Sequence, residues 1–510
     1  MLKKITKSWW IIFCCLVLLT CLITNSLHLF KGDLLFHTDI ARDFLVMDDI
    51  VTTRSPTLIG PKSGGVSGVF HGPAWYYLNL PIFALTNGNP AAIGWFWMII
   101  FIGYLALFYY LSSRMLGNKN ALTAVTLLAS LTVFAPKGLM QCSPAAFLVL
   151  PFIYFTWLYL QKWKPWALVV SVLILGFIIQ FQMAFGVPIA ILMGSYLVYK
   201  IVKSKKWLHL LCFAAILLPL STFILFDLRH DFLQSRSVIN YFSIKNPNDD
   251  WTIIKYLSER FDSVIDCFTF LRSPNGLARI ISGMVGFFAL IFVGLKHKKM
   301  DEKVKSAWVI SAIIIFGFWV VTIPFKDKVW GFYYEAILPL TCLWWAYLAS
   351  LYKKWGMLMI SLIILINVVF SVQSGLHYFK SSDIDDEVHW RFYRHLIKDI
   401  VNNNRGEDFG YFVFTPDQLG YQAKYALDYY IPTATRFKKE PITYLIIAPN
   451  DNLNPWANED YWQSEQVRIV GEADEQWSYP SGYVVKKYYL STDELSVEAD
   501  QNLVDGLQFR

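Results

Sequence analysis

The chain has 510 residues, of which 55% are hydrophobic, 17% aromatic and only 16% charged, and its mean hydropathy is +0.40. A soluble domain normally has about 25% charged residues, so this composition excludes an ordinary soluble enzyme, a disordered chain and a disulfide scaffold. The net charge of +7 is uneven, because residues 373–510 hold 13 basic and 22 acidic residues. A basic, apolar part followed by an acidic, polar part predicts a membrane domain over 1–372 and a soluble domain over 373–510.

Eleven segments are apolar and close enough to 20 residues in length to cross a bilayer as helices. They are 9–27, 91–112, 120–135, 144–161, 165–182, 184–200, 207–226, 276–295, 306–323, 333–351 and 355–372.

Charged loops between these segments predict the topology. Cytoplasmic loops are rich in Lys and Arg, and the basic loops all fall on one side only if 74–86 does not cross. We therefore expect 74–86 to lie as an interfacial helix at the outer face. The sequence predicts a polytopic α-helical membrane protein with a cytoplasmic N-terminus, large external loops at 28–90 and 227–275, and an external C-terminal domain.

The first external loop carries two carboxylates and a cation in one short stretch. Asp39 and Asp43 are four residues apart, so they share one face of a helix, and Arg42 lies between them. Two carboxylates near one cleft can serve as general base and metal ligand, or they can position an acceptor hydroxyl. The alternative is a solvated interfacial helix whose acids pair with Arg42 and Arg54.

A glycine-rich stretch, LIGPKSGGVSG, follows in the same loop. Its glycines permit close backbone approach to a ligand, and Lys62 could meet a phosphate as a point charge. A flexible loop without a ligand is the alternative. His71, in His71-Gly72-Pro73, could bind a diphosphate or an acceptor, or it could cap the helix that follows.

Two later segments also bring ionisable residues to the outer face. Arg229 and His230, in FDLRHDF, would lie at headgroup depth, where a guanidinium suits phosphate oxygens. The alternative is lipid-headgroup contact or pairing with Asp227 and Asp231. Tyr334 and Glu335 stand at the outer start of a predicted span. An aromatic belt explains the tyrosine, but the carboxylate requires a polar cavity.

The acidic tail predicts a small α/β domain. We expect helices at 382–402 and 417–429 and strands at 410–415, 443–448 and 483–490. The tail has no nucleotide-binding glycine motif and no nucleophile elbow. Its sequence therefore favours a packing or acceptor-docking role.

Several of these motifs together resemble bacterial relatives of glycosyltransferase family 39, which have the GT-C fold and include protein O-mannosyltransferases and the lipid A aminoarabinose transferase. The motifs are TDIARD at 38–43, PTLIGPKSGG at 56–65, FHGPAWYYL at 70–78, FDLRH at 226–230 and FYYEAILPL at 332–340. The resemblance covers the membrane part. It implies transfer of a sugar from a polyprenyl phosphate carrier to an acceptor outside the cytoplasm.

The resemblance also implies roles for individual residues. Asp39 would be the catalytic or acceptor-orienting carboxylate, with Asp43 in support. Contacts to the carrier phosphate would come from Arg42, Lys62, Arg229 and His230. His71, Tyr334 and Glu335 would line the same pocket.

The chain departs from the family pattern at two places. It has Asp39-Ile40 where Asp-Glu is common, and Cys142-Ser143-Pro144 where many members have Asp before Pro. These departures weigh against a two-carboxylate metal site. We therefore assign no residue as a metal ligand, and a divalent metal ion as cofactor remains an open alternative.

Two other functions remain open from the sequence. A flippase or transporter of lipid-linked sugars should have inverted repeats and polar, broken midplane helices. A scaffold for envelope assembly needs no catalytic carboxylate. None of the three functions involves nucleic acid; all three place the chain in the cell membrane.

Overall fold

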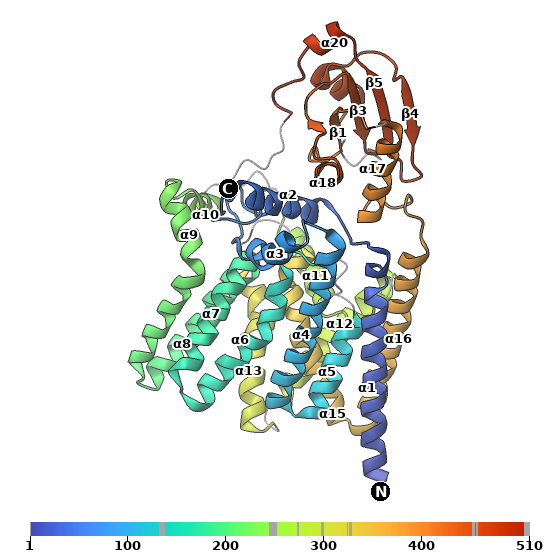
Figure 1. The fold of residues 1–510 in the computed structure, drawn as a ribbon. Helices are drawn as coiled ribbons and strands as arrows, with labels where there is room; N and C mark the ends of the chain where they lie inside the picture. Colours follow the sequence, from blue (N-terminus) through green and yellow to red (C-terminus); the bar gives the residue numbers. More distant parts are fainter. Residues whose placement is uncertain are drawn as a thin grey trace. The chain divides into compact units, whose positions relative to one another are not determined.

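The computed structural model describes residues 2–131, 138–243, 252–272, 275–296, 300–323, 325, 329–404, 406–450, 454 and 457–503. The end of the predicted span 120–135 and part of the loop 227–275 lie outside these residues. The chain divides into two compact units, coloured by sequence in Figure 1. Unit 1 holds Met1–Leu27, Thr57–Leu78 and Trp97–Leu376, and unit 2 holds His28–Pro56, Asn79–Phe96 and His377–Arg510.

Long apolar helices make the chain a multi-pass membrane protein. Within the described residues, eight helical segments are long and apolar enough to cross a membrane. They are α1 (Leu2–Ser26), α4 (Pro90–Leu116), α6 (Ser143–Lys162), α8 (Met183–Lys203), η2 with α9 (Trp207–Ile216 and Leu217–Arg229), α12 (Gly276–Leu295), α13 (Glu302–Val321) and α16 (Lys353–Lys380).

The other three predicted spans fall on shorter helices, so a count of eleven is not confirmed. These are α5 (Asn118–Leu131), α7 (Pro165–Phe181) and α15 (Leu338–Leu351), with 14, 17 and 14 residues. Helix α3 (Ala74–Leu85) has 12 residues and contains Pro81. At 1.5 Å per residue it is about 18 Å long, well short of a hydrocarbon core of about 30 Å. Its length agrees with the prediction that 74–86 does not cross.

Small and polar side chains bring the helices of unit 1 together. Gly176 of α7 packs against Pro219 of α9, and a Cβ on the glycine would come within 2.2 Å of the proline ring. Asn367 of α16 donates to the carbonyl oxygen of Phe270 at 2.9 Å and accepts from the amide of Arg272 at 2.8 Å. Between helices in a membrane the hydrophobic effect gives little attraction. Close approach and buried hydrogen bonds of this kind hold the helices together instead.

Unit 2 contains a five-stranded mixed sheet with the order β2-β1-β3-β5-β4. Its strands are β1 (Gly410–Phe414), β2 (Thr435–Arg436), β3 (Ile442–Ile447), β4 (Glu475–Ser478) and β5 (Val484–Tyr489). Strand β1 runs parallel to β2 and β3, whereas β5 is antiparallel to β3 and β4.

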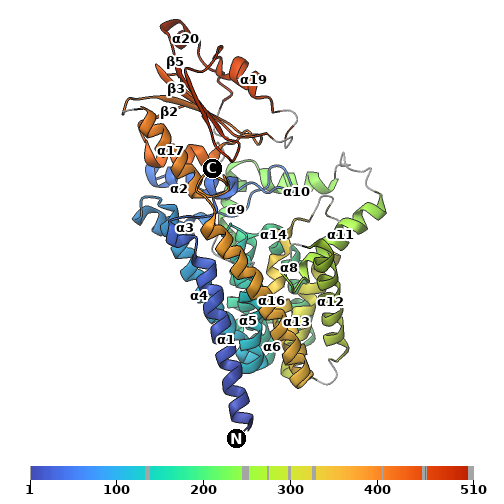
Figure 2. The ribbon, with the colours of Figure 1, turned by 90° about the vertical axis from the view of Figure 1, so that its right-hand side faces the viewer.

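Helices cover both faces of this sheet (Figure 2). On one face, Phe412 and Leu445 form a core with Trp462 from the helix η5 (Trp462–Val467), which continues α19 (Glu459–Tyr461). On the other face, Tyr444 donates to Asn403 of α17 (Trp390–Asn404), and Tyr411 to Asp428 of α18 (Tyr421–Tyr430). A terminal helix, α20 (Thr492–Ser496), begins with a capping box at Ser491.

The sequence located three of the five strands. Strands β1, β3 and β5 lie where they were predicted, and the helices predicted at 382–402 and 417–429 begin later, at Trp390 and Tyr421. No sequence pattern indicates that His28–Pro56 packs with the tail. In the structure, α2 (Thr38–Thr53) belongs to unit 2 and packs against α18 (Figure 1).

Candidate functional site

Helix α2 of unit 2 presents the two predicted carboxylates around one guanidinium. Arg42 donates to Oδ1 of Asp39 at 2.6 Å, and its Nε and Nη2 both donate to Oδ1 of Asp43, at 3.0 and 2.8 Å. The three residues lie on one face because i, i+3 and i, i+4 positions are neighbours on a helix. Arg42, assigned to the carrier phosphate from the sequence, is thus engaged by two acids of its own helix.

The two carboxylates differ in exposure. The side chain of Asp43 is 3% exposed, whereas that of Asp39 is 50% exposed. A buried carboxylate held by a charged, two-pronged donor is structural in character. The exposed Asp39 carboxylate can reach a ligand, so the geometry favours Asp39 over Asp43 as a base.

The start of α2 is fixed by a neutral histidine. Nδ1 of His37 accepts a hydrogen bond from the amide of Asp39 at 3.3 Å, which satisfies one of the free donors at the helix N-terminus. Burial lowers the pKa of His37, with Asp39 raising it and Arg42 lowering it to smaller extents. A lowered pKa keeps the ring neutral at neutral pH, as an accepting Nδ1 requires.

The loop after β1 holds the same helix end. Thr38 donates to Oδ2 of Asp417 at 3.0 Å, and Gln422 of α18 donates to the Thr38 hydroxyl at 3.1 Å. The other oxygen of Asp417 accepts from Thr415 at 2.6 Å and from the amide of Leu419 at 3.0 Å. The tail therefore sets the position of the residue next to Asp39.

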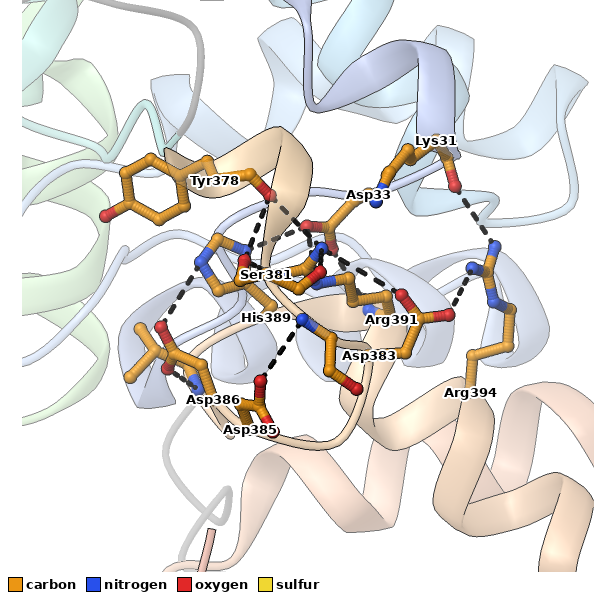
Figure 3. Close-up of polar contacts among 12 residues, drawn as sticks. Lys31, Asp33, Tyr378, Ser381, Asp383, Asp385, Asp386, His389, Arg391 and Arg394 are labelled. Carbon is orange, nitrogen blue, oxygen red and sulfur yellow. Dashed lines mark hydrogen bonds and ion pairs between the residues drawn. The ribbon is translucent and has the colours of Figure 1, made fainter. Parts of the chain in front are cut away.

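A buried ionic cluster anchors the segment that leads into α2 (Figure 3). Asp33, 2% exposed, lies 2.9 Å from Nδ1 of His389 and 3.5 Å from Nε of Arg391. Arg391 also donates to the carbonyl oxygens of Tyr378 and Ser381. These residues were missed from the sequence, because nothing in the spacing of positions more than 350 residues apart indicates contact.

Backbone pairing reinforces this anchor. The amide of Phe36 donates to Val388 at 2.7 Å, and the amide of Trp390 donates to Leu34 at 2.9 Å. The ring of Phe36 also packs edge-on against Trp390. Unit 2 therefore holds residues 33–38 as a short strap that runs directly into α2.

In unit 1, the glycine-rich loop folds back on itself. Lys62 and Phe70 form an isolated antiparallel bridge, and the amide of Gly60 donates to His71 at 2.7 Å. Lys62 is exposed at this bridge. Gly65, nearer the loop tip, lies against Phe325 and the hydroxyl of Tyr333, leaving no room for a Cβ.

His71 lies buried at the turn between α7 and α8. Its Nδ1 accepts from the amide of Met183, the first residue of α8, at 3.5 Å. Gly72 donates to the backbone of Gln180 at 2.8 Å, and a Cβ on Gly72 would collide with the Gln180 amide. The His-Gly-Pro motif thus docks its loop onto this turn.

Two buried amides at this turn were not identified from the sequence. Nε2 of Gln180 donates to Thr222 at 2.8 Å, and Nε2 of Gln182 donates to the carbonyl oxygen of Phe332 at 3.3 Å. Within the part of the chain that the structure describes, the Oε1 atom of neither residue has a partner. Their signal is weak, since they are only two glutamines at the end of an apolar segment.

The FDLRHDF segment packs onto the glycine-rich loop. The ring of Phe226 packs against the ring of Phe70, with 5.7 Å between their centroids. The ring of His230 stacks on Phe226 from its own position, with 4.1 Å between those two centroids. The amide of Phe70 donates to Gln234 at 3.0 Å. Arg229 is exposed, and no ion pair with it occurs among the described residues.

The segment around Glu335 meets the same part of unit 1. Tyr334 is buried, and its carbonyl oxygen contacts the thiol of Cys267 of α11 (Ile253–Cys267) at 3.7 Å. Glu335 is partly buried in the short helix η4 (Glu335–Ile337). For the residues described, no ion pair or hydrogen bond involves its carboxylate. A carboxylate so placed beside apolar helices normally marks a polar site.

Three of the four predicted features therefore converge within unit 1: the glycine-rich loop with His71, the Arg229–His230 segment, and the Tyr333–Glu335 segment. The fourth, with Asp39, Arg42 and Asp43, belongs to unit 2. Over the described ranges, no group of three or more His, Cys, Asp or Glu side chains could hold a metal ion.

Comparisons with known proteins agree with this architecture. No family model matches the sequence, and no curated protein matches it. The structure is similar to ArnT from Cupriavidus metallidurans bound to undecaprenyl phosphate, with a TM-score of 0.55, 11% identity, and coverage of 95% of this chain and 98% of that one. The apo state of the same protein gives a TM-score of 0.55, 10% identity, and coverage of 98% and 99%. The chain thus has an ArnT-like fold, which confirms the GT-C-like architecture that its sequence resembles.

Proposed function

We propose that this chain is a membrane glycosyltransferase that moves a sugar from a polyprenyl phosphate carrier to an acceptor at the outer face of the cell membrane. The observation that carries the proposal is the likeness to ArnT, which extends over nearly the full length of both chains and includes a neighbour bound to undecaprenyl phosphate. Fold alone does not fix a function, so the residues of each unit supply the chemical argument.

Asp39 is the proposed acceptor of the proton. Half of its side chain is exposed at the start of α2, and Arg42 holds it at 2.6 Å. The guanidinium orients the Asp39 carboxylate, and Asp43 binds the same guanidinium from its buried position. Arg42 is thereby a positioning residue rather than a phosphate ligand, which revises its assignment from the sequence.

Unit 1 supplies the proposed contacts to the carrier phosphate. Arg229 and Lys62 are exposed on segments joined by the Phe70–Phe226 contact. His230 is held against Phe226 by stacking and by a 2.9 Å contact between its Nδ1 and the Phe226 carbonyl oxygen. An anchored loop with two exposed cations can stabilise charge that develops on a departing phosphate.

The buried amides of Gln180 and Gln182 are proposed contacts to the sugar. Buried polar atoms nearly always have a hydrogen-bond partner. The Oε1 atoms at the α7–α8 turn have none among the described residues, so they call for water or a ligand hydroxyl. Tyr334 and Glu335 would line the same polar region, because Gln182 donates to the neighbouring Phe332.

The proposed reaction is a displacement at the anomeric carbon. The bond from that carbon to the phosphate oxygen breaks, and the electron pair leaves with the phosphate, which the cations stabilise. The acceptor oxygen forms the new bond as its proton passes to Asp39. Positive charge on the sugar ring in the transition state resembles that of glycoside cleavage.

Binding of the carrier can be tested separately from transfer. We would measure retention of undecaprenyl phosphate by the purified protein in nanodiscs, comparing the wild type with Arg229→Gln and Lys62→Gln. Arg114→Gln, at the predicted cytoplasmic end of α4, is the matched control. The proposal predicts that loss of either outer cation weakens binding about tenfold, while the control binds as the wild type does. Equal binding by all four proteins would remove Arg229 and Lys62 from the phosphate site.

A further inference from the structure

An apolar cavity of about 290 Å³ opens between helices α5, α12, α15 and α16 of unit 1. Leu127 of α5, Val285 of α12 and Trp345 of α15 line it together with residues at the start of α16. The described residues that form its walls are all apolar or aromatic, and none of them is charged. Neither the sequence motifs nor the proposed transfer reaction uses this cavity.

Close helix crossings fix the walls of the cavity. A Cβ on Gly356 of α16 would come within 2.1 Å of the carbonyl oxygen of Ala349 of α15, so the two helices touch backbone to backbone. Nε1 of Trp345 donates to the carbonyl oxygen of Gly286 at 3.1 Å, which ties α15 to α12. Phe270 packs edge-on against Trp345. The cavity is therefore built into the packing of the bundle.

The open side of the cavity faces outward from the bundle. The side chains of Trp355 and Met359, which line it, are 67% and 66% exposed, and Val285 is also exposed. A purely apolar cavity offers water no hydrogen-bond partner and does not hold it. In a membrane, a hydrocarbon chain is the chemistry that fits such walls.

Lysines gather where the cavity reaches the end of the bundle. Lys353 and Lys354 begin α16, directly after α15, and Lys296 follows the last residue of α12. Within the described part of the chain, no ion pair involves any of the three. The turn from α15 to α16 lies at the end of unit 1 where α1 begins, as Figure 1 and Figure 2 both show. This is the end that the sequence predicts to be cytoplasmic.

Aromatic rings place two of these ammonium groups at the cavity. Nζ of Lys354 lies 5.4 Å from the centre of the Trp355 ring, which lines the cavity. Nζ of Lys296 lies 5.0 Å from the centre of the Phe292 ring, and that ring lies 6.3 Å from Tyr352 on the cavity wall. Tyr and Trp favour the headgroup level of a bilayer, and lysines there keep their charge at the interface.

We propose that this cavity binds an acyl chain of an anionic phospholipid, whose phosphate meets Lys296, Lys353 and Lys354. Clustered lysines beside a groove between membrane helices attract lipids with net negative charge, whereas a zwitterionic headgroup brings a cation of its own. The polyprenyl carrier is not the proposed occupant, because α9, which ends at Arg229, ends at the opposite end of unit 1 (Figure 1). Binding of the phospholipid does not depend on the transfer reaction.

The test is native mass spectrometry of the full-length protein in detergent. We would titrate it with phosphatidylglycerol and with phosphatidylcholine that carries the same acyl chains. The proposal predicts that one phosphatidylglycerol binds about tenfold more tightly than phosphatidylcholine. Equal affinity for the two lipids would overturn it.

Variants assign the bound lipid to the cavity. Joint replacement Lys353→Gln and Lys354→Gln should lower the affinity for phosphatidylglycerol about tenfold and leave that for phosphatidylcholine unchanged. Ala289→Phe, on the cavity wall, should weaken the binding of both lipids by filling the space. Lys203→Gln is the matched control, because Lys203 ends α8 with its Nζ 5.6 Å from the Tyr199 ring and lies outside the cavity. It should bind as the wild type does.

Two further outcomes would contradict the proposal. One is a phosphatidylglycerol preference of wild-type size in the double lysine variant, which tests the exposed turn even if Ala289→Phe alters the fold. The other is displacement of phosphatidylglycerol from the wild type by an equal concentration of undecaprenyl phosphate, which would assign the cavity to the carrier.

Discussion

The hydroxyl of Thr38 donates a hydrogen bond to Oδ2 of Asp417 across 3.0 Å, although the two residues are 379 positions apart in the chain. This bond joins the first residue of α2 to the loop that follows β1. It gives the C-terminal domain a definite role, since the domain holds the helix that carries the proposed base.

The first prediction concerns that bond. Replacing Asp417 with Ala removes the acceptor of Thr38 and frees the α2 N-terminus to shift. Because misplacement of a reacting group by about 1 Å can cost 100-fold in rate, we expect transfer by Asp417→Ala to fall at least about tenfold in kcat, with a smaller change in KM for the carrier. Asp493→Ala, on the exposed α20, is the control and should transfer normally. Full activity of Asp417→Ala would show that the tail does not position α2.

The two carboxylates of α2 should separate stability from activity. Asp43→Asn removes the buried negative charge that the Arg42 fork binds, so the free energy of unfolding should fall by about 1.5–3 kcal/mol. Asp39→Asn keeps an exposed polar side chain and should melt close to the wild type. Thermal melting followed by circular dichroism compares the two. Equal destabilisation by the two substitutions would contradict the assignment of a structural role to the buried Asp43 and not to the exposed Asp39.

Acidification should loosen the start of α2. Burial lowers the pKa of His37 in the folded state, so below the unfolded value of about 6.5 the unfolded chain binds the proton more readily. The contribution of the neutral His37 ring to the free energy of unfolding is therefore present above about pH 6.5. It is lost as the pH falls through the lower pKa of the folded state. We expect the protection factors for hydrogen exchange at Thr38–Ala41, corrected for the intrinsic effect of pH, to fall more in wild type than in His37→Asn between pH 7.5 and pH 5. An equal loss of protection in both proteins would exclude His37 as the source.

The Asp33 cluster should be a stability determinant of unit 2. Asp33→Asn leaves the buried Arg391 without its charge partner, and breaking a buried ion pair in this way costs about 3–5 kcal/mol. Limited proteolysis should then cut within 28–56 or 377–404 much faster. Asp383→Asn, at a carboxylate 43% exposed and 3.9 Å from Arg391, should have little effect. Similar cleavage of both variants would count against a special role for Asp33.

The features that the sequence predicts well are those that depend on local residue patterns. Apolar length located the long helices, and the uneven Lys and Arg content argued against a crossing at 74–86. Short, continuous apolar runs located β1 and β3 in the tail. Each of these signals depends on residues within about 20 positions of one another.

The features that sequence could not predict depend on contacts between distant positions. Asp33 and His389 look like ordinary loop residues until the fold brings them within 2.9 Å. Pairing of the α2 acids with Arg42 was an alternative that the sequence left open, but the spacing does not show that Asp43 is buried and Asp39 exposed. Gln180 and Gln182 are distinguished only by the fold, which leaves their Oε1 atoms without a partner among the described parts of the chain.

The proposed transferase activity can be measured as sugar transfer from a synthetic polyprenyl phosphosugar, with wild type, Asp39→Asn and Asp48→Asn compared in nanodiscs. Asp48 lies on the same helix and is exposed, which makes it the matched control. We expect transfer by the wild type and by Asp48→Asn, and a loss of about 100-fold or more in Asp39→Asn, in line with removal of a general base. Undiminished transfer by Asp39→Asn, or movement of the carrier across the bilayer with no transfer by any of the proteins, would show that Asp39 is not the base or that the protein is not a transferase.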